Sequence, residues 1–135
     1  MSIYREYLHA QVRELLTAYG EIDYLFFDFT YPGAKDGWSG KGPDDWDAAG
    51  LLALCRELQP NMLVNDRLGI PADFVTPEQY QPTAPIVRDG VALTWEACQT
   101  LNGSWGYDRD NTDQKSSTLL TQMPVSYTHL RAHET

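Results

Sequence analysis

The chain has 135 residues, with 19 acidic and 10 basic side chains and a formal net charge of −9. This balance argues against a nucleic-acid partner, because such proteins need a basic surface to replace the counterions of the phosphates. Hydrophobic residues make up 42% of the chain, enough to bury a core. No run approaches the roughly 18 apolar residues of a membrane span, so we expect no membrane partner.

Residues 3–19 carry apolar side chains at the spacings that line one face of a helix: Leu8, Val12, Leu15, Leu16 and Tyr19. Gly20 follows as the expected C-cap. Residues 22–29 then form a short, almost continuous apolar run rich in aromatics. Such a run is typical of a strand that is buried on both faces, as in a parallel sheet.

A glycine-containing loop follows, and Asp44 is expected to cap a second helix. The apolar face of this helix would consist of Leu51, Leu54, Cys55 and Leu58, and Pro60 would end it. Residues 62–65 predict a second short strand, and residues 73–75 and 93–95 predict further short apolar segments. A last, weak helix is predicted for residues 113–122.

The alternation of helices and strands predicts parallel β/α units and the α/β fold class. A (β/α)8 barrel needs eight such units and typically about 250 residues. We therefore expect about half of a TIM-like barrel in residues 1–123. Residues 124–135 (PVSYTHLRAHET) continue no earlier pattern and resemble the translated junction tails of some metagenomic reading frames.

Neither the cysteines nor the histidines indicate a metal site. Cys55 and Cys98 lie in apolar stretches and are expected to be small buried hydrophobes. His129 and His133 are four residues apart, a spacing that can bind a metal on a helix, but they lie in the foreign-looking tail. We expect no metal.

Polar residues follow the predicted strands, where functional residues of β/α barrels lie. Asp28 interrupts an aromatic strand near its end, Arg67 follows the second strand, and Glu78 follows a later apolar segment. Burying a carboxylate among aromatic rings is costly, which favours a functional role for Asp28 over that of a structural cap. Arg67 is either its counter-charge and a donor to sugar hydroxyls, or a salt bridge at the rim.

Glycoside hydrolysis requires a pair of carboxylates, one as nucleophile and one as acid/base. Asp28 suits the first role, and both Glu78 and Glu96 are candidates for the second. Separation along the chain does not give distance in space, so both pairings remain open. Four Trp and eight Tyr fit sugar stacking, but they also fit an ordinary core.

Four segments carry a family resemblance: ELLTAYGEIDYLFFDFTYP, LVNDRLG, DFVTPEQY and TWEACQTLNGSWGYDRDN. In this order, across about residues 4–122, they closely resemble the catalytic domain of bacterial α-L-fucosidases, glycoside hydrolase family 29. The resemblance implies a retaining enzyme on a (β/α)8-like barrel that releases L-fucose from α-linked glycans without a cofactor. It implies Asp28 as the nucleophile, Glu78 as the acid/base with Glu96 as the alternative, and sugar contacts from Arg67, Phe26 and Trp105.

The chain also departs from this family. Members begin well upstream of Met1 and continue beyond Gln122 into a Gly-Gly-Asn-Leu-Leu-Leu-Asn segment that is absent here. We expect the 135-residue chain to be inactive or barely active alone, and to self-associate through exposed barrel edges. The first residues lack the apolar core of a signal peptide. The compartment therefore stays unknown, and a periplasmic or secreted full-length protein is compatible with the sequence.

Three alternatives remain at this point. A non-catalytic carbohydrate-binding remnant would keep the aromatic residues but would not need Asp28. A barrel glycosidase could act on a different sugar. A purely structural or interaction protein would leave the clustered strand-end acids without an explanation.

Overall fold

The computed structural model describes residues 2–28, 30–33, 37 and 40–112. The predicted helix at residues 113–122 and the tail at residues 124–135 lie outside this range. The chain divides into two compact units, Met1–Val75 and Thr76–Thr135, and each is described by itself.

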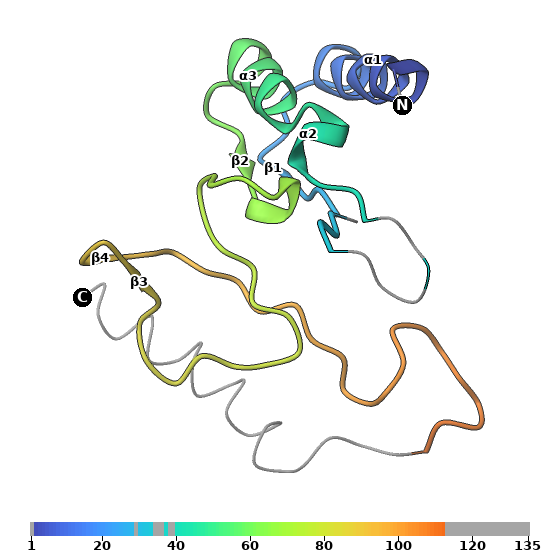
Figure 1. The fold of residues 1–135 in the computed structure, drawn as a ribbon, viewed down its shortest axis with the longest axis vertical. Helices are drawn as coiled ribbons and strands as arrows, with labels where there is room; N and C mark the ends of the chain where they lie inside the picture. Colours follow the sequence, from blue (N-terminus) through green and yellow to red (C-terminus); the bar gives the residue numbers. More distant parts are fainter. Residues whose placement is uncertain (1, 29, 34–36, 38–39, 113–135) are drawn as a thin grey trace. The chain divides into compact units, whose positions relative to one another are not determined.

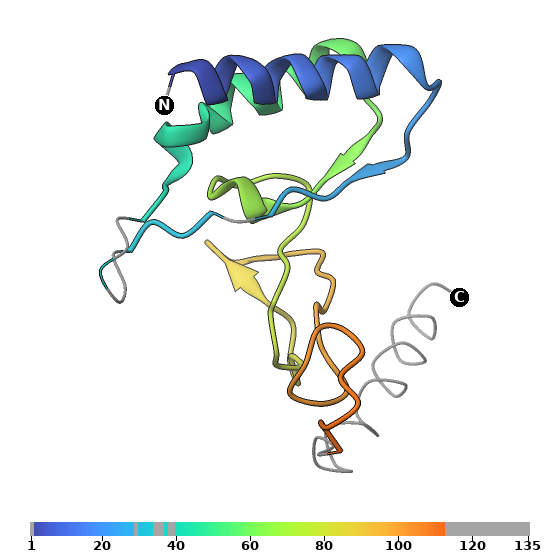
Figure 2. The same ribbon diagram turned by 90° about the vertical axis from the view of Figure 1, so that its right-hand side faces the viewer.

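The first unit is a layer of helices on a pair of parallel strands. Helices α1 (Ser2–Ala18) and α3 (Ala48–Leu58) lie side by side, and the short α2 (Pro43–Trp46) precedes α3 (Figures 1 and 2). Strand β1 (Tyr24–Leu25) pairs in parallel with β2 (Leu63–Val64), so that Tyr24 lies opposite Leu63. The order helix, strand, helix, strand confirms the α/β class that the sequence predicts.

The core of this unit lies between the helices and the strands. The predicted apolar face of α3 is confirmed, because Leu51, Leu54 and Cys55 are buried and Leu58 packs against them. Helix α1 contributes Val12 and Leu16, whereas Leu15 and Tyr19 are exposed, so that part of its predicted face is wrong. Helices α2 and α3 cover only a narrow stripe of α1. Side chains of α1 beside that stripe therefore reach solvent.

The predicted second helix is in fact two helices. It begins at Pro43 with Gly42 as its N-cap, so the prediction that Asp44 is the cap is wrong. Proline fits the first turn of a helix because the missing N–H has no partner there. Asp47 then breaks the helix with a left-handed φ of 55° and caps α3, its side chain accepting a hydrogen bond from the Gly50 N–H at 3.3 Å.

The strands are shorter than predicted, and β1 is not buried on both faces. Leu25 and Phe27 pack against the core, whereas Tyr24, Phe26 and Leu63 are 37%, 41% and 51% exposed. These residues follow the alternation of strand side chains and lie on the face away from the helices. One face of the described strand pair is therefore uncovered.

The predicted segment at residues 73–75 lies along the other edge of β2. Asn65 and Phe74 form a parallel bridge, and the Asp73 N–H donates to the Val64 carbonyl at 3.1 Å. The Asp73 carboxylate accepts from the Val64 N–H at 2.6 Å and from the Arg56 guanidinium at 2.6 Å. The backbone and the side chain of Asp73 therefore bond both polar backbone groups of Val64 at this edge.

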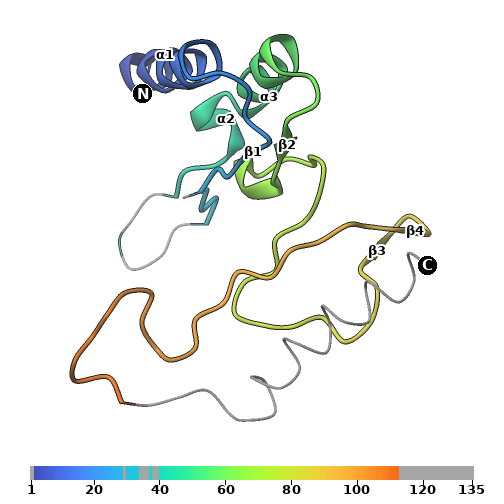
Figure 3. The ribbon, with the colours of Figure 1, turned by 180° about the vertical axis from the view of Figure 1, so that it is seen from behind.

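The second unit has no helix among its described residues 76–112. Its hairpin joins β3 (Val87–Arg88) to the antiparallel β4 (Val91–Ala92) (Figure 3). Asp89 and Gly90 form the turn with φ of 51° and 79°, the positive values that a tight hairpin turn requires. The Leu93 N–H extends the hairpin with a bond to the Ile86 carbonyl at 2.8 Å, where the sequence predicted a separate segment.

No helix in the described part of the chain combines the length and apolar character needed to cross a membrane.

Candidate active site

The ends of β1 and β2 bring Asp28 and Arg67 together. The Arg67 Nη1 lies 3.7 Å from the Asp28 Oδ1, and their side chains are 17% and 43% exposed, respectively. This distance allows electrostatic attraction but exceeds a hydrogen bond. The Asp28 carboxylate therefore faces a cation and stays accessible to a ligand, so the expectation that it is buried among aromatic rings is wrong.

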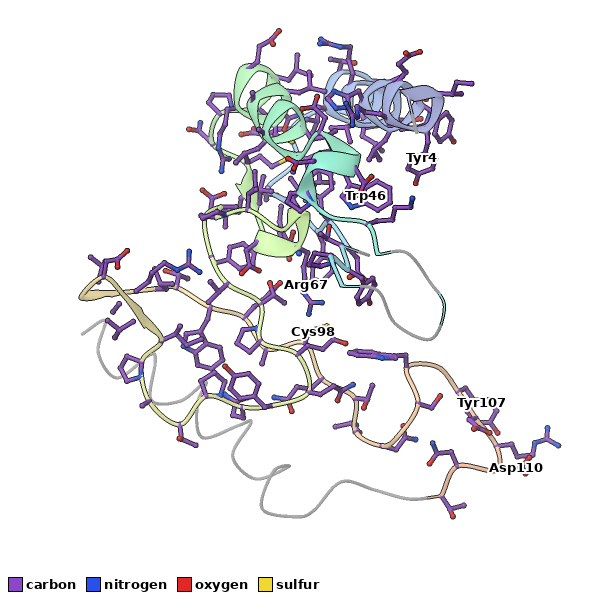
Figure 4. All side chains as sticks on the ribbon, viewed as in Figure 1. Tyr4, Trp46, Arg67, Cys98, Tyr107 and Asp110 are labelled. Atoms are coloured by element: carbon purple, nitrogen blue, oxygen red, sulfur yellow. The ribbon has the colours of Figure 1, made fainter. Side chains whose placement is uncertain are left out.

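A short 3-10 helix, η1 (Asp66–Leu68), carries Arg67. Leu68 is buried and anchors the turn in the core, and the Gly69 N–H donates to the Asp66 carbonyl at 2.9 Å. Arg67 projects from η1 away from α1 and α3 (Figure 4). The hydrophobic anchor next to Arg67 thus fixes the backbone from which its side chain extends.

Asn65 connects the two strand ends, although it is not among the predicted site residues. Its side chain is fully buried, and its Oδ1 accepts from the Phe27 N–H while its Nδ2 donates to the Phe27 carbonyl, both at 3.0 Å. The local signals are its position as the last residue of the predicted strand at 62–65 and its place at the start of the polar run Asn65–Arg67. A buried asparagine needs hydrogen-bond partners, but the sequence does not identify a partner 38 residues away.

Phe26 and Asp28 follow β1 and are both exposed, whereas Leu25 and Phe27 pack against the core. Its ring meets Tyr24 in an edge-on contact, with centroids 6.2 Å apart and planes at 76°. Tyr24 in turn contacts Phe74 at 5.3 Å. The acidic group therefore lies on a partly exposed aromatic surface.

Glu78 and Glu96 lie in the second unit on neighbouring segments. Glu78 and Cys98 form a parallel bridge, in which the Gln79 N–H donates to the Cys98 carbonyl at 2.9 Å. Glu78 is exposed, whereas Glu96 is half-buried and accepts a hydrogen bond from the Thr76 hydroxyl at 2.9 Å. The backbone pairing thus brings the segments of both acid/base candidates into one substructure.

The six predicted site residues therefore divide between the units. Asp28, Arg67 and Phe26 belong to the first unit; Glu78, Glu96 and Trp105 belong to the second. Trp105 is 61% exposed in the segment that follows Glu96. The structure brings together the Asp28–Arg67 pair directly, and the Glu78 and Glu96 segments through the bridge to Cys98.

The two cysteines occupy different surroundings, and neither forms a disulfide. Cys55 is buried as predicted, and burial raises the pKa of its thiol against the opposing effect of Arg56. Cys98 is only half-buried, so the prediction that it is buried is wrong. Within the described ranges, no three His, Cys, Asp or Glu residues are grouped to hold a metal ion; His129 and His133 lie outside these ranges.

Comparisons with known proteins agree on one family. The family model described as alpha-L-fucosidase matches residues 1–128. The α-L-fucosidase isoenzyme 1 from Paenibacillus thiaminolyticus is 40% identical over 91% of this chain, with a TM-score of 0.74. The α-L-fucosidase AlfC from Lactobacillus casei, in complex with α-L-fucose, is 24% identical over 90% of this chain with a TM-score of 0.55, a likeness of fold.

The chain spans 30% of the length of the Paenibacillus structure and 33% of that of the Lactobacillus structure. No curated protein matches it significantly.

Proposed function

The chain belongs to the α-L-fucosidase family, and on that premise we propose that the whole protein is a retaining exo-glycosidase that releases L-fucose from α-linked fucosyl glycans. The observation that carries the proposal is the accessible Asp28 carboxylate at the end of β1, 3.7 Å from the Arg67 guanidinium. A carboxylate so placed can approach a sugar ring, and a guanidinium beside it supplies several fixed donors for hydroxyl groups.

In the proposed reaction the ionised Asp28 attacks the anomeric carbon of fucose. The bond to the leaving oxygen breaks as Glu78, protonated at the start, gives its proton to that oxygen. Glu78 then removes a proton from water, which attacks the covalent fucosyl–Asp28 intermediate and frees Asp28. A retaining pair of this kind works at about 5–5.5 Å separation. The chemistry requires neither a metal nor an organic cofactor.

Two observations favour Glu78 over Glu96 as the acid/base. Glu78 is exposed at the bridge to Cys98, so a leaving-group oxygen can reach its carboxyl group. Glu96 accepts the Thr76 hydroxyl and is half-buried, which suits a residue that holds two segments together. Glu96 remains the alternative acid/base.

Phe26 and Trp105 are proposed to contact the sugar beside Arg67. Fucose carries a methyl group where most hexoses carry a hydroxymethyl group, and an apolar wall suits that methyl. Both rings are accessible, at 41% and 61% exposure. A fucosylated glycan is accordingly the proposed partner.

We further propose that residues 1–123 are part of a (β/α)8 barrel and that residues 124–135 are a non-native tail. The parallel β1–β2 pair and the segment at Phe74 support successive parallel strands. The uncovered face that carries Tyr24, Phe26 and Leu63 supports a missing second layer, because parallel sheets are normally covered on both faces. The same face and strand edges favour self-association of the isolated chain.

The test compares the purified 135-residue chain with the enzyme obtained by extending its reading frame in the source DNA, on an aryl α-L-fucoside. We expect turnover only from the extended enzyme. There, Asp28→Asn should lower kcat by about 10⁴-fold or more, as for removal of other nucleophiles. Asp23→Asn is the matched control, since Asp23 is an exposed carboxylate just before β1.

Five results would contradict parts of the proposal. Equal activity of Asp28→Asn and Asp23→Asn would exclude Asp28 as the nucleophile, and an inverted sugar anomer in the proton NMR spectrum would exclude retention. Turnover by the 135-residue chain alone would overturn its predicted inactivity. Glycan binding without turnover by the extended protein would favour a carbohydrate-binding remnant, and turnover of a different aryl glycoside would favour another sugar.

A further inference from the structure

Asn65 uses both of its side-chain polar atoms on the peptide groups of one residue. Its Oδ1 accepts from the Phe27 N–H and its Nδ2 donates to the Phe27 carbonyl, both at 3.0 Å, and the side chain is fully buried. The pair of bonds fixes position and orientation together, because rotation of the Phe27 peptide groups would break at least one bond. Asp28 is the next residue in the chain.

The side-chain amide of Asn65 replaces the next backbone hydrogen bonds that β2 would make to the chain after β1. Backbone pairing of β1 with β2 extends through Leu25 and Val64, and beyond that the backbone of Asn65 turns into η1 as its N-cap. Because the backbone turns away at Asn65, its side chain bonds the Phe27 N–H and carbonyl instead. The main chain of β2 can therefore turn away without releasing the end of β1.

The same turn brings Arg67 to Asp28. Arg67 follows Asn65 by two residues, and the buried Leu68 holds the turn in the core. One residue thus fixes the peptide before Asp28 and begins the turn that carries its cationic partner. The two charged groups that follow these bonded segments lie 3.7 Å apart.

We propose that Asn65 is a positioning residue, whose buried amide holds Asp28 against Arg67 by clamping both peptide groups of Phe27. Its effect on catalysis rests on the proposed nucleophilic role of Asp28. Asn65 itself does not touch the sugar in this proposal. It acts through the backbone.

A second amide provides a matched control at the opposite end of β1. The Gln59 Oε1 accepts from the Ile22 N–H at 2.8 Å, and its Nε2 donates to the carbonyls of Leu16 and Gly20 at 2.8 and 2.9 Å. Gln59 thus also bonds backbone groups near β1 through its side chain. These groups lie before β1 in the chain, whereas Asp28 lies after it. Loss of the Gln59 side chain should weaken the fold without moving the charged pair.

The first experiment needs no activity and uses the 135-residue chain. Nuclear magnetic resonance would follow the amide exchange of Phe27 and the side-chain signals of Asp28 and Arg67 in Asn65→Ala and in Gln59→Ala. In Asn65→Ala we expect exchange at Phe27 to rise about tenfold or more, as for a lost hydrogen bond, and both side-chain signals to shift. Gln59→Ala should raise exchange at Ile22 and leave those two signals in place.

Asn65→Asp provides a milder change if the alanine variant does not fold. The aspartate keeps an acceptor for the Phe27 N–H but loses the donor to the Phe27 carbonyl, so the same two side-chain signals should shift. If neither Asn65 variant moves them more than Gln59→Ala does, the positioning role is wrong, whatever the activity of the protein.

The second experiment measures kinetics in the extended enzyme. Displacement of a reacting group by about 1 Å can cost about a hundredfold in rate, so Asn65→Ala should lower kcat by that order with KM little changed. Gln59→Ala should retain kcat at temperatures where both variants are folded. If the Asp28 signals shift in Asn65→Ala but kcat matches that of Gln59→Ala, the catalytic importance of this clamp is refuted.

If Asp28→Asn does not lower the activity of the extended enzyme, the proposed function is refuted instead. Shifts of the Asp28 and Arg67 signals in Asn65→Ala would still support the positioning role of Asn65 in that case.

Discussion

Removal of the Asp73 carboxylate tests the edge of β2 most directly. Its Oδ2 accepts from the Val64 N–H and from the Arg56 Nη2, each at 2.6 Å. Asp73→Ala would leave the N–H of a fully buried residue without this acceptor, which costs about 1–3 kcal/mol. The Arg56–Asp73 ion pair is about one-third exposed and adds at most about 1 kcal/mol.

The expected loss in the free energy of unfolding is therefore about 1–4 kcal/mol. For a urea m-value of about 2 kcal/mol/M this corresponds to a midpoint lowered by about 0.5–2 M. Circular dichroism at a helical wavelength is a suitable readout, because all helices of the described chain belong to the first unit.

Asp73→Asn is the matched variant for this prediction. Its side-chain carbonyl can still accept the Val64 N–H, so it should lose only the charge and retain most of the stability. If Asp73→Ala unfolds at the wild-type midpoint, the carboxylate does not hold the edge of β2. If the asparagine and alanine variants lose the same stability, the backbone bond contributes nothing beyond the ion pair.

Three further predictions concern packing, thiol chemistry and backbone conformation. Leu51→Ala should lower the free energy of unfolding by about 2–5 kcal/mol because Leu51 is fully buried, whereas alanine at the exposed Leu101 should change it by less than about 0.5 kcal/mol; equal urea midpoints would contradict this core. Iodoacetamide should label Cys98 in the folded chain and Cys55 only on unfolding, as read by mass spectrometry of the peptides, because the Cys55 thiol is buried and its pKa is raised. The folded state keeps that thiol protonated longer than the unfolded state does, so stability from Cys55 is present below the ordinary thiol pKa and is lost as the pH rises above it; Cys55→Ser should flatten this alkaline decline, and an unchanged decline would refute the assignment. Gly69→Ala should cost about 1–2 kcal/mol in a urea titration, since its φ of 82° is unfavourable for a residue with a Cβ, and an unchanged midpoint would show that η1 can end in another way.

Local patterns in the sequence predicted helices in the regions of α1 and α3 and the α/β fold class, but not the break at Asp47. The spacing of Leu51, Leu54 and Cys55 predicts the buried face of α3, because each turn of a helix returns a side chain to the same side. Alternating helical and apolar segments likewise predict parallel strands. The Asp89–Gly90 turn is also a local signal, since this dipeptide favours a tight hairpin, although the elements predicted from the sequence do not include β3 and β4.

For the site residues, the sequence pattern predicted only that they follow the ends of strands. Asp28 interrupts an apolar run and Arg67 follows the next strand, so a parallel arrangement favours their proximity. The structure shows that proximity. The sequence gives no comparable reason for the bond between Thr76 and Glu96, which joins residues 20 positions apart.

The sequence by itself therefore determined the α/β class, the buried face of α3 and the resemblance to α-L-fucosidases. Only the tertiary structure decided where the strands end, which strand face is uncovered, and that Asn65 clamps Phe27 while Asp73 holds Val64. The physical reason is the range of the interactions. Periodicity and capping act within a few residues, whereas the hydrogen bonds of Asn65 join groups 38 residues apart that meet only after the helices have packed on the strands.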